Sequence, residues 1–240
     1  MRLLALLGAL AAFAAVVTTA ADAAVRTSNG SSAKSEGVVA AIDHYRTVTW
    51  QWQRVMHVPR TRSSFVARKS PDAAYRRWVL RLWKRRAHRV EARAARWLDS
   101  RTAAYRDAAR HWERVIGSSS GPLRETAGAA TSLQARLALM RNWKRRANDL
   151  EIRAANPPYE SAWLCIHRYE GSWTDSGAPY YGGLQMDINF QQTYGSYLLA
   201  TKGTADNWTP AEQMWVAARA HMSGRGFYPW PNTARACGLI

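Results

Sequence analysis

Hydrophobic residues recur at steps of three and four along most of the first two thirds of the chain. Two stripes with this period occupy residues 38–55 and 75–116, and a third helical segment follows residue 122 and runs to about residue 155. Segments rich in Ser, Pro and Gly separate them, at residues 57–71 and 117–122. Because a period near 3.6 residues places apolar side chains on one face of a helix, the pattern predicts three helices.

The helical region repeats itself at an offset of 60 residues. The pentapeptide WKRRA at 83–87 recurs at 143–147, and Trp52 recurs as Trp112. The two copies align at this offset without any insertion or deletion. Each copy predicts a helix, a loop and a second helix, and the second helix of the first copy continues into the second copy. The predicted fold class is therefore mainly α, with residues 38–155 forming an elongated antiparallel bundle or coiled coil.

The pattern changes after the Pro-rich segment 156–158, which predicts a linker followed by a separate small domain at 159–240. In that domain a short helix is expected to end at Glu170, directly before a glycine. The aromatic, glycine-punctuated stretch at 180–186 predicts a hairpin or an extended segment. The sequence Thr-Pro-Ala-Glu at 209–212 supplies an N-cap, a first-turn proline and a capping-box glutamate, which predict a helix start.

The first 24 residues carry one arginine, an apolar run and a small-residue cleavage site, and they predict a secretory signal peptide at 1–24. A retained membrane anchor is the alternative, although the run is short for a span. The polar residues 25–37 predict a flexible leader. Since no later segment has an apolar run long enough to span a bilayer, we expect a secreted or cell-envelope-associated protein with no membrane span in the mature chain.

Positive charge is concentrated in the predicted helical region. The chain has 34 Lys and Arg against 17 Asp and Glu, yet residues 160–240 hold only five basic and six acidic residues, which leaves 29 and 11 before them. The Lys-Arg-Arg clusters at 84–86 and 144–146 favour attraction to anionic polymers of the cell envelope. A solvated spacer is the alternative. Nucleic acid is not expected as a partner, because an exported protein is kept apart from the nucleic acids of the cell and no base-stacking motif is present.

Glu170 is the candidate catalytic residue. It lies at the predicted helix end, with Trp163, Tyr169 and Trp173 close in sequence. A carboxyl that aromatic side chains partly shield from water is suited to general acid catalysis. A solvated helix end is the alternative for an isolated glutamate before glycine.

Residues able to hold a sugar ring follow Glu170 in the sequence. Tyr180 and Tyr181 offer flat faces, and Gln185 offers hydrogen bonds. Trp230 stands between two prolines, which would stiffen it as an aromatic wall.

Both cysteines, Cys165 and Cys237, lie in the C-terminal domain. Export would deliver them to an oxidising compartment where they can pair, and two buried free thiols are the alternative. Two cysteines without CxxC or HxxxH spacing make no zinc signature, so neither a metal nor another cofactor is expected.

Three motifs together resemble a known family. They are Glu-Gly-Ser-Trp at 170–173, Tyr-Tyr-Gly-Gly-Leu-Gln at 180–185 and Gly-x-Gly-x-x-Pro-Trp-Pro at 224–231. In this order they resemble the transglycosylase-like domain of resuscitation-promoting factors, over residues 159–240. The resemblance implies a small, reduced lysozyme-like α+β domain that acts on peptidoglycan, with Glu170 as its catalytic residue.

The resemblance also implies a substrate site and a function. The implied substrate residues are Tyr180, Gln185, Asp187 and Trp230. A disulfide between the two cysteines is implied as well. Two features depart from the family: Cys165 lies five residues before Glu170, whereas the family's cysteine directly precedes the glutamate, and Asn189-Phe190 replaces the Thr-Trp pair expected after the Gln185 segment. The predicted function is cleavage of the bond between N-acetylmuramic acid and N-acetylglucosamine in peptidoglycan glycan strands, by a lytic transglycosylase or muramidase. The alternative is a non-catalytic glycan-binding protein that its basic bundle tethers to the cell wall.

Overall fold

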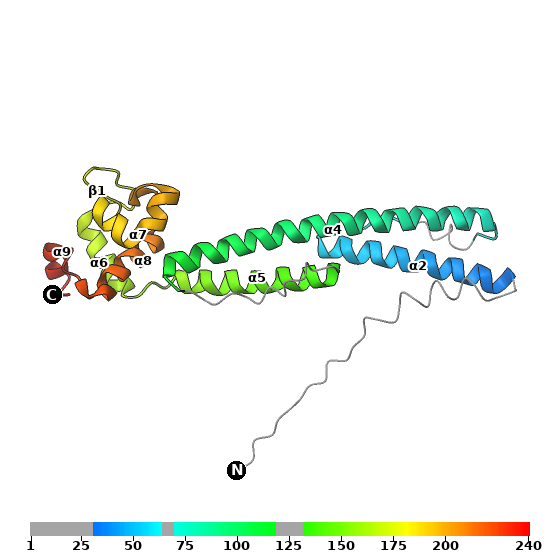
Figure 1. The fold of residues 1–240 in the computed structure, drawn as a ribbon, viewed down its shortest axis with the longest axis horizontal. Helices are drawn as coiled ribbons and strands as arrows, with labels where there is room; N and C mark the ends of the chain where they lie inside the picture. Colours follow the sequence, from blue (N-terminus) through cyan, green and yellow to red (C-terminus); the bar gives the residue numbers. More distant parts are fainter. Residues whose placement is uncertain (1–30, 64–69, 119–131) are drawn as a thin grey trace, which may run out of the picture. The chain divides into compact units, whose positions relative to one another are not determined.

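The computed structural model describes residues 31–63, 70–118 and 132–240. The predicted signal peptide and the first part of the predicted leader lie outside these residues. The chain divides into two compact units, one up to Trp97 and one from Leu98 onward. Helices dominate both units, and one two-stranded sheet is found among the described residues (Figure 1). The predicted class, mainly α with a small α+β part, is confirmed.

Helix α2 (Ser31–Val55) and the first part of helix α4 (Ala73–Ile116) make up the first unit. Because α2 begins at Ser31, the prediction of a flexible leader was wrong for residues 31–37. Ala, Lys, Ser and Glu fill most of that stretch and are tolerated in a helix, so α2 extends beyond its apolar stripe. One hydrophobic cluster in this unit consists of the buried residues Ile42, Val79 and Trp83.

The rest of α4 and helix α5 (Leu133–Ala154) open the second unit. The α5 helix begins after Ser132, whose side-chain oxygen accepts a hydrogen bond from the backbone N–H of Ala135 at 3.1 Å. Such an N-cap satisfies one of the unpaired donors of the first turn.

In each unit the two long helices, α2 with α4 and α4 with α5, run in the same direction, so the predicted antiparallel arrangement was wrong. In the second unit Asp99 pairs with Arg136 and, further along both helices, Glu113 pairs with Arg146. In the first unit the N-terminal ends of α2 and α4 lie at the same end (Figure 1). The lengths of the connecting segments allow this, because 16 or 17 residues can span about 50 Å, more than the length of α2 or α5. Only short loops force neighbouring helices to be antiparallel.

The 60-residue repeat is visible in the packing. Trp83 and Trp143 are both buried, and so are their repeat-related neighbours Ala87 and Ala147. The repeat therefore records two helix pairs that bury equivalent faces.

The C-terminal part of the second unit contains short elements. In chain order they are α6 (Glu160–Glu170), β1 (Tyr180–Tyr181), β2 (Met186–Asp187), α7 (Ile188–Lys202), the 3₁₀ turn η1 (Ala205–Asn207), α8 (Pro210–Ala220), the π turn η2 (His221–Arg225) and α9 (Pro231–Ala236). The predicted end of α6 at Glu170, the hairpin and the capping box of α8 between Thr209 and Glu212 are all present. The sequence patterns did not predict α7 and α9.

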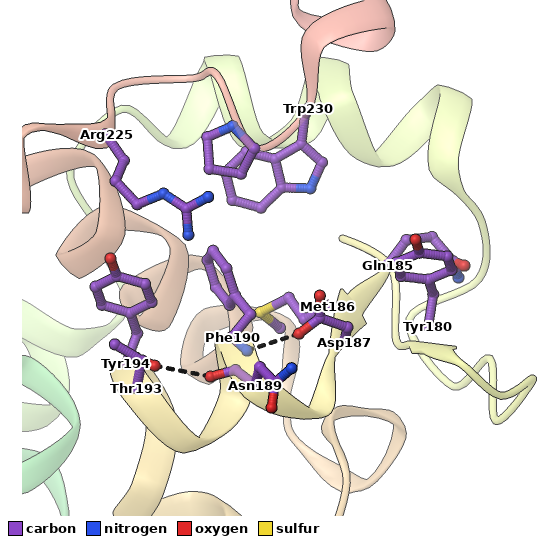
Figure 2. Close-up of a pocket in the computed structure, with 11 residues that line it drawn as sticks. Tyr180, Gln185, Met186, Asp187, Asn189, Phe190, Thr193, Tyr194, Arg225 and Trp230 are labelled. Carbon is purple, nitrogen blue, oxygen red and sulfur yellow. Dashed lines mark hydrogen bonds between the residues drawn. The ribbon is translucent and has the colours of Figure 1, made fainter.

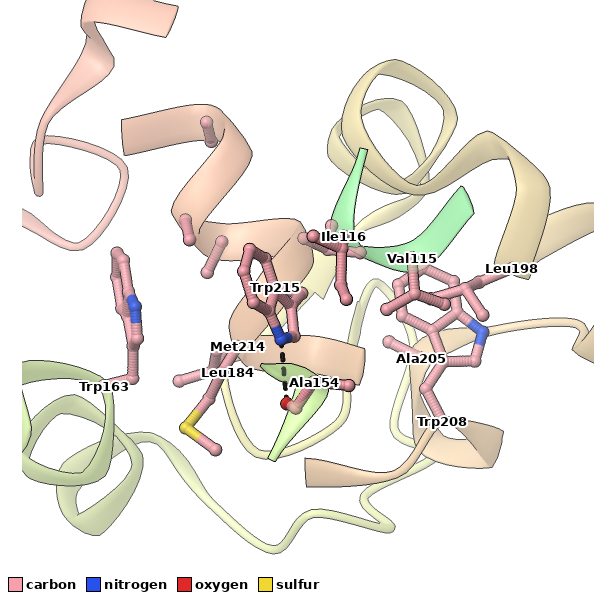
Figure 3. Packing of buried hydrophobic residues seen from close by; sticks show 14 of the residues in the cluster. Val115, Ile116, Ala154, Trp163, Leu184, Leu198, Ala205, Trp208, Met214 and Trp215 are labelled. Carbon is pink, nitrogen blue, oxygen red and sulfur yellow. Dashed lines mark hydrogen bonds between the residues drawn. The ribbon is translucent and has the colours of Figure 1, made fainter. Parts of the chain in front are cut away.

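One hydrophobic core joins these short elements to the ends of α4 and α5. Val115 and Ile116, at the end of α4, pack in the same cluster as Trp215 of α8 (Figure 3). The indole N–H of Trp215 donates to the carbonyl oxygen of Ala154 at 2.8 Å. The packing therefore continues across residues 156–158, the predicted linker, and the division between units lies within α4 instead.

Within the described parts of the chain, every helix is too short or too polar to cross a lipid bilayer.

Candidate functional site

A cleft of about 270 Å³ opens beside the β-hairpin. Its walls come from the hairpin, the first turns of α7 and the segment before α9, and Figure 2 shows Tyr180 and Gln185 at one side with Tyr194 and Arg225 at the other. Four residues proposed from the sequence are brought together in its lining: Tyr180, Gln185, Asp187 and Trp230.

Tight backbone packing positions the hairpin that forms one wall. Gly182 has a φ of 73°, and a Cβ there would lie 2.5 Å from the side-chain oxygen of Gln213. That same oxygen accepts a hydrogen bond from the backbone N–H of Gly183 at 2.9 Å. Gly182 thus lets the hairpin approach the buried Gln213 of α8, and Gly183, where a Cβ would lie 2.6 Å from Nδ1 of His167, lets it approach α6.

Glu170 is the last residue of α6 and is half-buried. Its Oε1 lies 2.7 Å from the hydroxyl oxygen of Thr233 in α9. A Cβ on the next residue, Gly171, would lie 3.3 Å from side-chain atoms of both Asp175 and Gln185. Glu170 does not itself line the cleft, but its partner Thr233 also bonds the backbone of the lining residue Trp230, and the lining residue Gln185 lies beside Gly171.

A disulfide holds the two helices that meet at Glu170. Cys165 of α6 is bonded to Cys237, which follows α9, with their Cα atoms 6.1 Å apart. The predicted pairing is confirmed. The bond links the helix that ends at Glu170 to the end of the helix that carries Thr233, and it restrains the two relative to each other.

Thr233 can serve either protonation state of Glu170. Its hydroxyl oxygen is 2.7 Å from the carboxyl oxygen and 3.3 Å from the carbonyl oxygen of Trp230. A hydroxyl both donates and accepts. Thr233 therefore donates to an ionised Glu170, and it accepts from a protonated Glu170 while donating to Trp230.

The two aspartates near the site are both occupied by structural hydrogen bonds. Asp175 accepts from the side-chain amide of Gln185 at 2.8 Å and, through its other oxygen, from the backbone N–H of Gly177 at 3.0 Å. Asp187 caps α7 by accepting from the backbone N–H of Phe190 at 2.7 Å, which leaves its second oxygen toward the cleft (Figure 2).

The aromatic residues proposed from the sequence take different positions. Tyr180 is exposed at the mouth of the cleft, whereas Tyr181 is half-buried against the core and is absent from the lining. Trp230 is only 4% exposed, and its indole N–H donates to the carbonyl oxygen of Leu184 at 2.6 Å. Trp230 is thus a fixed wall of the cleft, with its polar atom already bonded inside the protein.

The structure adds residues that the sequence reasoning missed. Thr193 and Tyr194 extend the α7 face that carries Asn189 and Phe190, and Arg225 faces them from η2. A hydrogen bond with Ser223 lowers the pKa of the Tyr194 phenol, aided by the nearby Arg225 charge. The four-residue helical spacing from 189 to 193 is a signal for this face, but it is readable only once α7 is known to be a helix.

Glu212 is a second prominent carboxylate, and its surroundings indicate a structural role. It is fully buried in α8, and its oxygens lie 2.7 and 2.9 Å from the ammonium of Lys202 and 2.8 Å from Nε2 of His111 in α4. Burial alone would raise the pKa of Glu212, but hydrogen bonds from His111, Lys202 and the Thr209 backbone lower it to about 2. An ionised carboxylate that its partners fully surround is an anchor between α4 and α8, and it is unsuited to proton transfer.

Comparison with known proteins identified no relationship: no family model, no curated protein and no solved structure matches the chain.

Proposed function

We propose that this protein is an exported enzyme that cleaves the glycosidic bond between N-acetylmuramic acid and N-acetylglucosamine in peptidoglycan. The observation that carries the proposal is the placement of Glu170. Its carboxyl group is half-buried at a helix end and meets the Thr233 hydroxyl at 2.7 Å. The same hydroxyl bonds the carbonyl oxygen of Trp230, a wall of the cleft, whose lining also offers an exposed tyrosine, an amide and a carboxylate, from Tyr180, Gln185 and Asp187.

The proposed reaction has two proton transfers at Glu170. As an acid, Glu170 gives its proton to the glycosidic oxygen, and the bond to C1 of the muramic sugar breaks with the electron pair leaving on that oxygen. As a carboxylate, Glu170 then removes the proton of the C6 hydroxyl, whose oxygen bonds to C1 and closes an anhydro ring. Thr233 suits both steps, because its hydroxyl accepts from the acid and donates to the carboxylate.

The state of the aspartates favours this route over hydrolysis with two carboxylates. Glycosidases usually need a second carboxylate as nucleophile or base. Both oxygens of Asp175 and one oxygen of Asp187 are engaged in holding the local fold. The free oxygen of Asp187, or the acetamido group of the sugar itself, would stabilise the cationic transition state.

The far side of the cleft favours an anionic part of the substrate. Arg225 is exposed there, beside Tyr194 (Figure 2). A guanidinium binds carboxylates through paired hydrogen bonds, and the stem peptides of peptidoglycan carry carboxylates. The resemblance of residues 159–240 to the resuscitation-promoting factor domain leads to the same proposal. The Cys165–Cys237 disulfide accords with export to an oxidising compartment.

The function is tested by mass spectrometry of muropeptides released from purified cell walls. Glu170→Gln should reduce release by about 10² to 10⁴-fold, the usual contribution of general acid–base catalysis. Glu160→Gln is the matched control, because Glu160 is exposed at the other end of the same helix. Anhydro ends in the products support a lytic transglycosylase, and reducing ends a muramidase.

A non-catalytic glycan-binding protein is the second candidate, favoured by the basic helical region. The proposed role of that region is to tether the protein to anionic polymers of the wall. No release by the wild-type protein, with wall binding intact, would replace the enzyme proposal by this one.

A further inference from the structure

A second hollow, of about 600 Å³, lies in the first unit. It is outside the candidate active site and contains no residue of the Lys-Arg-Arg clusters. Its lining combines one end of α2 with the segment that follows it: Arg46, Trp50, Arg60, Thr61, Arg62 and Ser63.

The segment after α2 is held against the helix by specific hydrogen bonds. The indole N–H of Trp50 donates to the carbonyl oxygen of Thr61 at 2.9 Å. The side-chain amide of Gln53 bonds Thr61 twice, donating to its hydroxyl at 2.7 Å and accepting from its backbone N–H at 3.0 Å. Gln53 is buried, so these bonds are shielded from water. Arg60 and Arg62, on either side of Thr61, therefore project from a fixed backbone.

Trp50 organises the positive charge of this hollow. The guanidinium carbon of Arg60 lies 3.4 Å from the centre of the indole ring, and that of Arg46 lies 4.8 Å from it. Stacking on a ring occupies the face of a guanidinium and leaves the N–H groups on its edge for a ligand. Asp43 pairs with Arg46 at 3.0 Å, so Arg60 and Arg62 supply the net positive charge.

The second copy of the repeat lacks this arrangement. The position equivalent to Trp50 is Arg110, and those equivalent to Arg60 and Arg62 are Ser120 and Pro122. Packing of the helix pair therefore does not require the Trp-Arg-Arg set, since the second copy forms the corresponding pair without it.

We propose that this hollow, the Trp50 site, binds the phosphate groups of a polyol-phosphate polymer of the cell envelope. A guanidinium group can donate two parallel hydrogen bonds to the oxygens of a phosphate. A tetrahedral phosphate accepts hydrogen bonds from several directions at once, which suits donors that come from Arg46, Arg60 and Arg62. A carboxylate accepts mainly in one plane. The proposal rests on the proposed tethering role of the helical region and is independent of the cleavage reaction at Glu170.

The test is calorimetric titration of the full chain with a synthetic glycerol-phosphate hexamer at physiological ionic strength. The double variant Arg60→Gln/Arg62→Gln should weaken binding by about tenfold or more, because it removes two charge-assisted contacts. Arg89→Gln/Arg93→Gln is the matched control, since both arginines are exposed in the same unit and the substitution removes the same charge. The control should weaken binding by less than about threefold, through loss of long-range attraction alone.

Three results would overturn the assignment. Equal losses in the two double variants would mean diffuse attraction without a site. A hexamer of glutamate that binds as tightly as the phosphate hexamer would remove the preference for phosphate. Tighter binding to phosphatidylglycerol vesicles at equal phosphate concentration would assign the site to a lipid surface. Muropeptide release, measured separately on the same Arg60→Gln/Arg62→Gln protein with soluble glycan fragments, should stay unchanged, so failure of the Trp50 site is distinguishable from failure of the enzyme proposal.

Discussion

The buried carboxylate of Glu212 offers a quantitative test of how the second unit is held together. Glu212→Gln keeps the shape of the side chain and removes its charge, while Lys202 and His111 keep access to water, with side chains 34% and 24% exposed. The variant thus isolates the free energy that ionised Glu212 gains from its partners in α4, α7 and the α8 cap.

The magnitude follows from the pKa of Glu212, which is about 2 in the folded protein against an ordinary value of 4.5. At about 1.4 kcal/mol per pKa unit, the ionised carboxylate stabilises the folded state by about 3 kcal/mol at pH 7. A lowered folded-state pKa means that this stabilisation is present above pH 4.5 and is lost as the pH falls toward 2. At pH 3 about 1 kcal/mol should remain.

Urea unfolding followed by tryptophan fluorescence measures the effect. The wild type should exceed Glu212→Gln by about 3 kcal/mol at pH 7 and by about 1 kcal/mol at pH 3. Glu151→Gln, an exposed change on α5, is the control and should stay within about 0.5 kcal/mol of the wild type. Equal stability of the two variants at pH 7, or a difference that widens as the pH falls, would refute the anchoring role.

Two further predictions concern the contact at Glu170. Thr233→Val should lower muropeptide release about tenfold and change its pH profile, because it removes the hydroxyl that can donate to or accept from Glu170. Thr233→Ser keeps a hydroxyl and should retain the wild-type release and pH profile. An unchanged pH profile in Thr233→Val would mean that Thr233 only packs against Glu170. The double variant Cys165→Ser/Cys237→Ser should lose about 4 kcal/mol of stability, since the disulfide closes a loop across a sequence separation of 72. Thiol titration of the denatured, non-reduced protein should find no free cysteine, and two free thiols would contradict the pairing.

Local signals were sufficient for several elements. The end of α6 at Glu170 follows from the glycine after it, and the start of α8 from the capping box of Thr209 and Glu212. By contrast α7 was missed, because its buried face includes the polar Gln191 and Gly195, which lies at a kink, so no continuous apolar stripe marks the helix. A Cβ at Gly195 would lie 2.6 Å from the ring of Trp208, so tertiary packing selects that glycine. A glycine inside a helix lowers the local helix propensity, so the sequence pattern here does not predict α7.

The sequence by itself determined the helical periodicity, the 60-residue repeat, the uneven charge and the candidate glutamate, because each is a property of neighbouring or regularly spaced residues. Only the tertiary structure decided that the helix pairs are parallel, since long connecting segments allow either direction. It also decided which partners meet across long separations: Thr233 with Glu170, and Glu212 with His111. Such pairs form when separate elements pack on a common core, and no local pattern records them. The Trp50 site arises in the same way, from a ring on α2 and two arginines on the segment that folds back over it.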